Sequence, residues 1–148
     1  MAHHTYRFEA VAAAPPDVVF EVLVDAPGWA SWAPMVGQAS YEREGVPAPH
    51  GVGAVRSFGA RVGPKSLEEV VVYEAPRRFA YEIRSAPLPV TGYRSEVELT
   101  ATDDGGTAVE WTGRFDTSVP GVAWLMRRSV AGFVRGLVTE SEGRAAPT

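Results

Sequence analysis

The sequence lacks cysteine, has few histidines and contains no long apolar run. The absence of cysteine from 148 residues excludes disulfides, thiolate nucleophiles and cysteine-ligated metal sites. The three histidines, His3, His4 and His50, are too scattered to indicate a metal site. No segment approaches the roughly 20 consecutive apolar residues that a membrane-spanning helix needs. We therefore expect neither a bound metal nor a membrane span.

An excess of positive charge is also missing. Fourteen Lys and Arg residues stand against 18 Asp and Glu residues, for a formal net charge of −4, so we expect no nucleic-acid partner. The opening Met1-Ala2-His3-His4 lacks the basic and then apolar run of a signal peptide, which predicts a cytoplasmic protein.

A dinucleotide-binding fingerprint is incomplete. Gly51 and Gly53 have the spacing of its first two glycines, but Arg56 stands where the third belongs, and a strand rather than a helix is expected to follow. We therefore expect no nucleotide cofactor, and no other cofactor is indicated.

The overall composition is that of a globular protein. Hydrophobic residues make up 45% and charged residues 22%, and the mean hydropathy is −0.08, which excludes a largely disordered chain. The length predicts one domain over residues 1–148.

Alternation of apolar and polar residues predicts seven strands. The first covers residues 5–13, where Tyr6 and Phe8 alternate with Arg7 and Glu9. Six more are expected at residues 36–44, 52–60, 66–74, 78–86, 92–102 and 107–117, separated by turns rich in Pro and Gly. Strands in series with short connections indicate an antiparallel meander.

Three helices are expected around this meander. Pro15-Pro16-Asp17 begins a short one that ends before Pro27-Gly28, and Trp29 and Trp32 share one side of a second, very short helix. Apolar residues over 119–140 recur with helical period and predict a long amphipathic helix. Over 121–138 it would be about 27 Å long. We expect the curved sheet to wrap around this helix and to leave unfilled space beside it.

Several short motifs, in this order, resemble a known superfamily. They are Ala14-Pro15-Pro16-Asp17-Val18-Val19-Phe20, Trp29 and Trp32 with Pro34, Gly51-Val52-Gly53-Ala54-Val55-Arg56, Glu69, Pro87-Leu88-Pro89-Val90 with Tyr93, and Gly106-Thr107 leading to Val109, Trp111 and Phe115. The chain resembles the SRPBCC superfamily, also called START-like or birch-allergen-like, and within it the polyketide cyclase/dehydrase group. The resemblance covers nearly the whole chain.

The resemblance implies an α+β helix-grip fold, in which a seven-stranded antiparallel sheet surrounds a long C-terminal helix. This agrees with the architecture inferred from the periodicities. It also implies a cavity for a hydrophobic or amphipathic small molecule, but no particular reaction, because a fold by itself does not define chemistry.

Strand alternation and helical spacing predict which side chains face the interior. The candidate ligand-binding residues are Phe58, Val71, Tyr81, Ile83, Tyr93, Ser95 and Trp111 on the strands, and Met126 and Phe133 on the long helix. Tyrosine hydroxyls in an apolar lining are suited to orienting an oxygen-bearing ligand.

Two charged residues, Arg56 and Glu69, are expected on the same inward face. An isolated buried charge costs several kcal/mol, so each needs a partner. They either form one ion pair without chemistry, or act in catalysis, with Arg56 anchoring an anionic ligand oxygen and Glu69 relaying a proton. A bulge near Gly59 or Gly63 would turn Glu68 inward instead of Glu69.

The sequence thus predicts a protein that binds a small hydrophobic or aromatic molecule, polyketide-like or lipid-like. If chemistry occurs, the resemblance implies cofactor-free cyclisation or dehydration of a poly-β-keto chain. The alternative is a non-catalytic carrier or sensor of a hydrophobic ligand.

Overall fold

A computed structural model describes residues 2–147 and contains seven strands and three helices. The elements in chain order are β1 (Ala2–Ala12), α1 (Pro16–Val24), α2 (Trp29–Trp32), β2 (Gln38–Arg43), β3 (Val55–Gly59), β4 (Lys65–Glu74), β5 (Arg78–Ser85), β6 (Thr91–Ala101), β7 (Thr107–Thr117) and α3 (Val122–Ala145).

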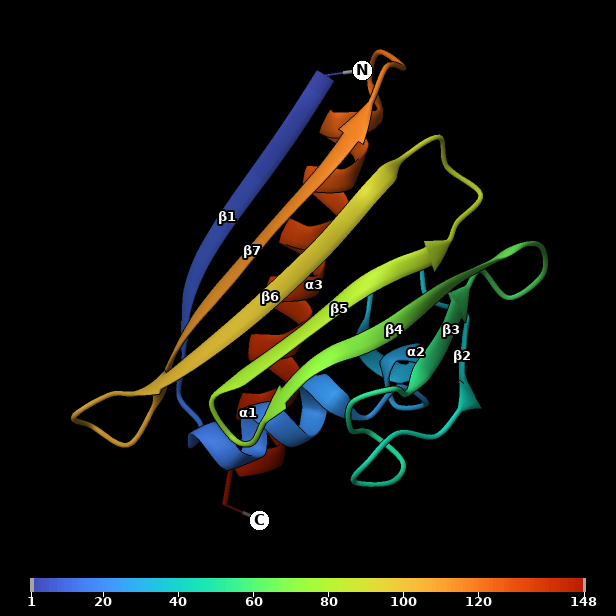
Figure 1. The fold of residues 1–148 in the computed structure, drawn as a ribbon. Helices are drawn as coiled ribbons and strands as arrows, with labels where there is room; N and C mark the ends of the chain where they lie inside the picture. The colour runs from blue at the N-terminus through green and yellow to red at the C-terminus, as the bar shows by residue number, and fades with distance from the viewer. Residues whose placement is uncertain (1, 148) are drawn as a thin grey trace.

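The strands form one antiparallel sheet in the order β1-β7-β6-β5-β4-β3-β2. The first strand therefore pairs with the last, and every other pair joins consecutive strands. The sheet curves around α3, which crosses behind it, and α1 and α2 lie near one end (Figure 1). Helix α3 packs against β1, β7, α1 and α2. The predicted α+β helix-grip architecture is confirmed.

Helix α1 forms where proline and aspartate favour a helix start. Pro15 has an extended backbone at the N-cap, Pro16 occupies the first turn, and Asp17 adds negative charge there. The β-branched residues of α1 are weak helix formers, so the helix depends on burial. Its apolar side chains Val19, Phe20, Val22, Leu23 and Val24 all lie in the core.

Helix α3 is longer than the sequence pattern indicates. Its 24 residues correspond to about 36 Å. Leu137 and Ser141 are fully buried, and the Glu142 carboxylate accepts a hydrogen bond from the Ala13 backbone N–H at 2.8 Å. These contacts stabilise the final turns against the link between β1 and α1.

Strand β3 is shorter than expected at its start. Val52 pairs with Val46 in an isolated bridge, and Gly53 adopts a φ of 92°, a conformation that glycine tolerates without strain. The chain therefore turns at residues 51–54 before the strand begins.

Among the described residues, no helix combines the length and apolar character that a bilayer-crossing helix requires.

Candidate functional site

Arg56 lies in the interior with its charge enclosed by aromatic rings. It is on β3 and is fully buried. The rings of Trp29, Phe58, Phe79 and Tyr81 lie 4.9–5.2 Å from its guanidinium carbon, close enough for cation–π attraction. The guanidinium is therefore held in place from several sides.

The hydrogen bonds of Arg56 are few for a buried guanidinium. One terminal nitrogen donates to the Glu68 carboxylate at 2.8 Å, and the other donates to the Leu23 carbonyl at 3.4 Å. The Trp29 indole donates to the same carbonyl at 2.9 Å, while the Nε atom of Arg56 has no partner among residues 2–147. The Glu68 carboxylate is thus the counter-ion of Arg56.

Glu68 faces the interior but is not completely enclosed. Its side chain is 13% accessible to solvent, whereas that of Arg56 is 0% accessible. Within residues 2–147, Oε1 bonds to Arg56 and Oε2 has no hydrogen-bond partner. Burial raises the pKa of Glu68, while the charge of Arg56 and the hydrogen bond from it oppose that rise. Glu68 thus presents one free oxygen to the accessible space beside it.

The predicted inward position of Glu69 is wrong, and the structure has Glu68 there instead. The Arg56 position pairs with Glu68 across β3 and β4, whereas Glu69 accepts ion pairs from Arg43 and Arg84 near the surface. The cause is a register shift in β4, where Val70 pairs with Tyr81 but Val72 pairs with Ala80.

The same bulge changes the position of Val71. Val71 is the extra residue between the two registers, and it is not part of the buried core, which holds Val70 at 0% exposure. The prediction that Val71 lines the interior is therefore wrong. Beyond the bulge the side-chain alternation is reset, since Tyr73 packs against Phe20 with ring centroids 5.3 Å apart.

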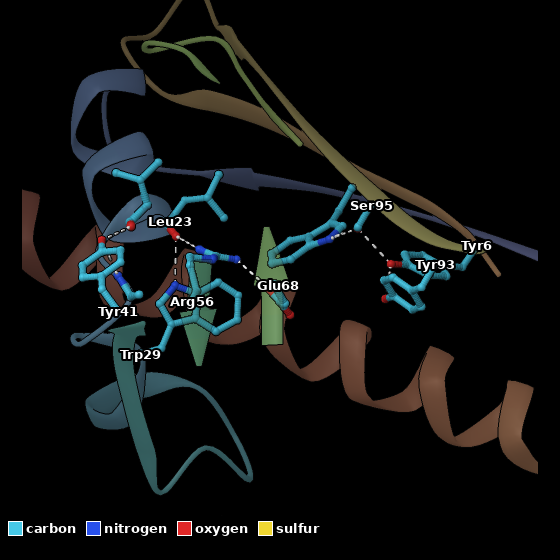
Figure 2. Close-up of polar contacts among 11 residues, drawn as sticks. Tyr6, Leu23, Trp29, Tyr41, Arg56, Glu68, Tyr93 and Ser95 are labelled. Atoms are coloured by element: carbon cyan, nitrogen blue, oxygen red, sulfur yellow. Dashed lines mark hydrogen bonds and ion pairs between the residues drawn. The ribbon is translucent and has the colours of Figure 1, made fainter. Parts of the chain in front are cut away.

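A second polar cluster lies further along the interior. The Tyr6 hydroxyl is 2.5 Å from the Tyr93 hydroxyl and 2.8 Å from Ser95 Oγ. Ser95 Oγ accepts from the Trp111 indole at 2.8 Å and donates to the Thr112 carbonyl at 3.0 Å. Figure 2 shows Glu68 between Arg56 and this Tyr6–Tyr93–Ser95 cluster, with α3 running alongside.

The tyrosines of this region are held in the neutral form. Burial raises the pKa of Tyr6 to about 12, against lowering by its hydrogen bonds to Ser95 and Tyr93. Burial also raises the pKa values of Tyr81 and Tyr93 well above the usual range, and the negative charge of Glu68 adds to both. The hydroxyls therefore keep their hydrogens and act as neutral hydrogen-bonding groups at physiological pH.

The sequence interpretation missed Tyr6 as a site residue. Tyr6 on β1 is paired with Gly113 on β7, and its ring lies over the place where a side chain at 113 would be. The signal was the glycine within the apolar alternation of β7, because such a glycine indicates a close approach by another group.

Replacing Gly113 with alanine is expected to displace Tyr6. The added Cβ would lie 2.2 Å from Cζ and 2.3 Å from Oη of Tyr6, so the ring must move and its hydrogen bonds must lengthen. We expect the free energy of unfolding in urea to fall by about 1–3 kcal/mol. Gly143→Ala in α3 is the control, since its added Cβ meets nothing within 4 Å and should be neutral or stabilising. Equal stability of the two variants would contradict this account.

Most other predicted site residues lie in the interior as expected. Phe58, Tyr81, Tyr93, Ser95, Trp111 and Met126 are buried, and Ile83 and Phe133 are partly buried against the core. Ile83 pairs with Glu68 across β4 and β5, so the two side chains share the concave face.

Aromatic side chains occupy one end of the interior. Trp29 lies 5.4 Å from Phe133 and 6.1 Å from Trp111 between ring centroids, so aromatic side chains from α2, α3 and β7 meet at this end of the interior. A hollow of about 550 Å³ lies on the outer face, where Arg7, Arg94 and Arg114 contribute to its lining. Beside these rings, the Glu68 side chain keeps its 13% accessibility to solvent.

Residues 2–147 contain no group of three or more His, Cys, Asp or Glu side chains placed to hold a metal ion. The site itself contributes the Glu68 carboxylate, the Arg56 guanidinium and the tyrosine hydroxyls.

The curved antiparallel sheet and the long C-terminal helix define a helix-grip protein. The family model described as "Polyketide cyclase / dehydrase and lipid transport" matches residues 3–142. The chain belongs to this family, which confirms the resemblance seen in the sequence.

Individual relatives agree with this assignment. A Mycobacterium tuberculosis protein described as uncharacterized is 27% identical over 111 residues, which are 75% of this chain and 65% of that protein. The match thus spans just under two thirds of the curated relative. A solution structure from Thermobifida fusca is 29% identical, covers 95% of this chain and 94% of its own, and has a TM-score of 0.74.

An enzyme of known class shares the fold. The structure of the ZhuI aromatase/cyclase from Streptomyces superposes with a TM-score of 0.82 at 20% identity, covering 98% of this chain and 97% of its own. At this identity the similarity concerns the fold alone.

Proposed function

We propose that this protein binds a small hydrophobic or aromatic molecule between the concave face of the sheet and α3, beside Glu68. The observation that carries the proposal is the state of Glu68, whose side chain is 13% accessible in an otherwise aromatic interior. A buried carboxylate that keeps one oxygen free of protein partners is costly. A ligand's polar group at that oxygen would offset the cost, while the surrounding rings contact its apolar part.

Family membership supports the same ligand class. The family description combines polyketide cyclisation or dehydration with lipid transport, and both involve largely apolar molecules. Ile83 pairs with Glu68 across β4 and β5 and supplies aliphatic surface beside it. The interior side chains Tyr93, Met126 and Phe133 add aromatic and thioether surface. The flexible Met126 side chain can adjust to a ligand at little cost.

Binding is tested with α-tetralone bearing one phenolic hydroxyl, here called hydroxytetralone, as a two-ring aromatic probe. Isothermal titration calorimetry should show saturable binding to the wild type. Ile83→Trp adds bulk next to Glu68 and should weaken binding about tenfold or more, since overfilled interiors exclude ligands. The matched control is Val62→Trp, at a residue 86% exposed, which should bind as the wild type does. Undiminished binding by Ile83→Trp would refute the proposed location.

A second candidate function is proton-transfer catalysis, as in a cofactor-free cyclase or dehydratase. The observation that favours it is the combination at Glu68 of a raised pKa, a free oxygen and the adjacent Arg56 cation. A carboxyl group whose pKa is raised toward neutrality is suited to general acid–base work. The guanidinium would stabilise negative charge developing on a substrate oxygen. A carrier would need the same space but no proton transfer.

A further inference from the structure

The hydrogens of the Tyr6–Tyr93–Ser95 cluster can be assigned from its partners. A carbonyl oxygen only accepts, and an indole N–H only donates. Ser95 has one hydroxyl hydrogen, which goes to the Thr112 carbonyl at 3.0 Å. Its oxygen accepts from the Trp111 indole at 2.8 Å.

The direction of the remaining bonds follows. Because the hydrogen of Ser95 is already used, the Tyr6 hydroxyl must donate to Ser95 across the 2.8 Å contact. The hydrogen of Tyr6 is then used as well, so Tyr93 must donate to Tyr6 across the 2.5 Å contact. The order of donation is Tyr93 to Tyr6 to Ser95 to Thr112.

Within this hydrogen-bonded series, the Tyr93 oxygen can still accept a hydrogen bond. Tyr6 both donates and accepts, and Ser95 donates once and accepts twice. The Tyr93 oxygen has given its hydrogen away and accepts from no group among residues 2–147. Glu68 lies to one side of the cluster (Figure 2), and the Tyr93 side chain is 5% exposed.

We infer that Tyr93 acts as a hydrogen-bond acceptor toward the ligand, so that the site selects molecules bearing a hydroxyl donor at this position. The inference rests on the proposed ligand-binding function. The ligand class is thus narrowed from hydrophobic or aromatic molecules to phenols, enols or alcohols with an apolar frame. An ether or ketone oxygen at the same place would meet an acceptor and leave both oxygens unpaired.

The wild-type protein provides the first test. Hydroxytetralone and its methyl ether, methoxytetralone, differ by one methyl group that replaces the donating hydrogen. We expect calorimetry to give hydroxytetralone about a tenfold lower Kd, the usual effect of one unpaired buried polar group. Equal affinities for the two probes would overturn the inference while leaving the ligand-binding function intact. If neither probe binds, the proposed function fails, and the inference fails with it.

Tyr6→Phe gives a second test. It separates a hydrogen-bonding cause of the probe preference from a steric preference for the smaller probe. Without the Tyr6 oxygen, the hydrogen of Tyr93 is released and can be donated to a ligand. The preference for hydroxytetralone should therefore shrink about tenfold, because methoxytetralone gains a donor. A structural role of Tyr6 alone would weaken both probes equally, and that outcome would contradict the assignment.

The matched control is Tyr41→Phe. Tyr41 donates to the Val24 carbonyl at 3.1 Å, outside the cluster, so its loss should leave the preference between the two probes as in the wild type. A changed preference in Tyr41→Phe would show that selectivity does not depend on the cluster and would count against the inference. Ser95 and Trp111 remain paired in Tyr6→Phe, and circular dichroism of each variant checks that it is folded.

Discussion

Replacing Arg56 with methionine is expected to lower the free energy of unfolding by about 3–5 kcal/mol, the usual cost of removing one partner from a buried ion pair. Arg56 is fully buried and provides the one hydrogen bond that Glu68 receives within residues 2–147. Methionine retains much of the apolar stem but leaves the carboxylate uncompensated. Urea unfolding followed by tryptophan fluorescence measures the loss.

Lowering the pH should reduce the loss of stability caused by Arg56→Met. Burial already raises the pKa of Glu68 above its ordinary 4.5, and without the opposing charge of Arg56 the pKa should rise further. A folded-state pKa above the unfolded value favours folding below the unfolded pKa, and this contribution is lost as the pH rises through the folded pKa. Arg56→Met should therefore be closest to wild-type stability in mild acid and furthest from it at neutral pH.

Two further variants distinguish the loss of the Arg56–Glu68 ion pair from a nonspecific loss of stability. Arg84 pairs with Glu69, and the Arg84 side chain is 53% exposed. Arg84→Met should therefore lower the free energy of unfolding by less than about 1 kcal/mol. The double variant Arg56→Met with Glu68→Leu should recover part of the stability lost in Arg56→Met, because no buried charge is then left without a partner. Strictly additive losses would contradict the proposed coupling.

Glu68→Gln is expected to produce the largest effect on chemistry. If Glu68 transfers protons, the wild type should accelerate exchange of the hydrogens next to the ketone of hydroxytetralone for deuterium. Glutamine keeps the shape and an oxygen for Arg56 but cannot transfer a proton. The accelerated exchange should therefore fall by about 10²–10⁴-fold. Mass spectrometry of the probe in heavy water gives the rate.

Glu69→Gln is the matched control, since it changes the neighbouring residue in the same way. Glu69 pairs with Arg43 and Arg84 near the surface, so its variant should exchange the probe at the wild-type rate. Exchange that is lost in Glu69→Gln and kept in Glu68→Gln would reverse the assignment. A wild type that binds the probe without accelerating exchange would favour the carrier function.

The sequence was sufficient to predict the architecture because its signals were local. Alternation over each strand and the 3.6-residue period after residue 119 predicted seven strands and a long terminal helix. The β4 bulge was harder to locate, because Val70, Val71 and Val72 are chemically alike and either register buries a valine. One inserted residue at Val71 reversed the faces of Glu68 and Glu69.

The site depended on pairings between distant segments. Tyr6 reaches Ser95 and Tyr93 because β1 pairs with β7 at the far end of the chain and Gly113 leaves space for the ring. Alternation placed Tyr6, Tyr93 and Ser95 on strand faces but could not show that their hydroxyls meet. The ring contacts of Trp29 with Phe133 and Trp111 also depend on tertiary packing, which is why a more open interior was predicted.

The most direct test of the account is the location of a bound ligand. Methyl-labelled protein titrated with hydroxytetralone should show nuclear Overhauser effects from the probe to the methyl groups of Met126 and Ile83 in NMR spectra. Contacts confined to the outer-face hollow near Thr5 and Thr112, with Met126 and Ile83 unaffected, would contradict binding between the sheet and α3.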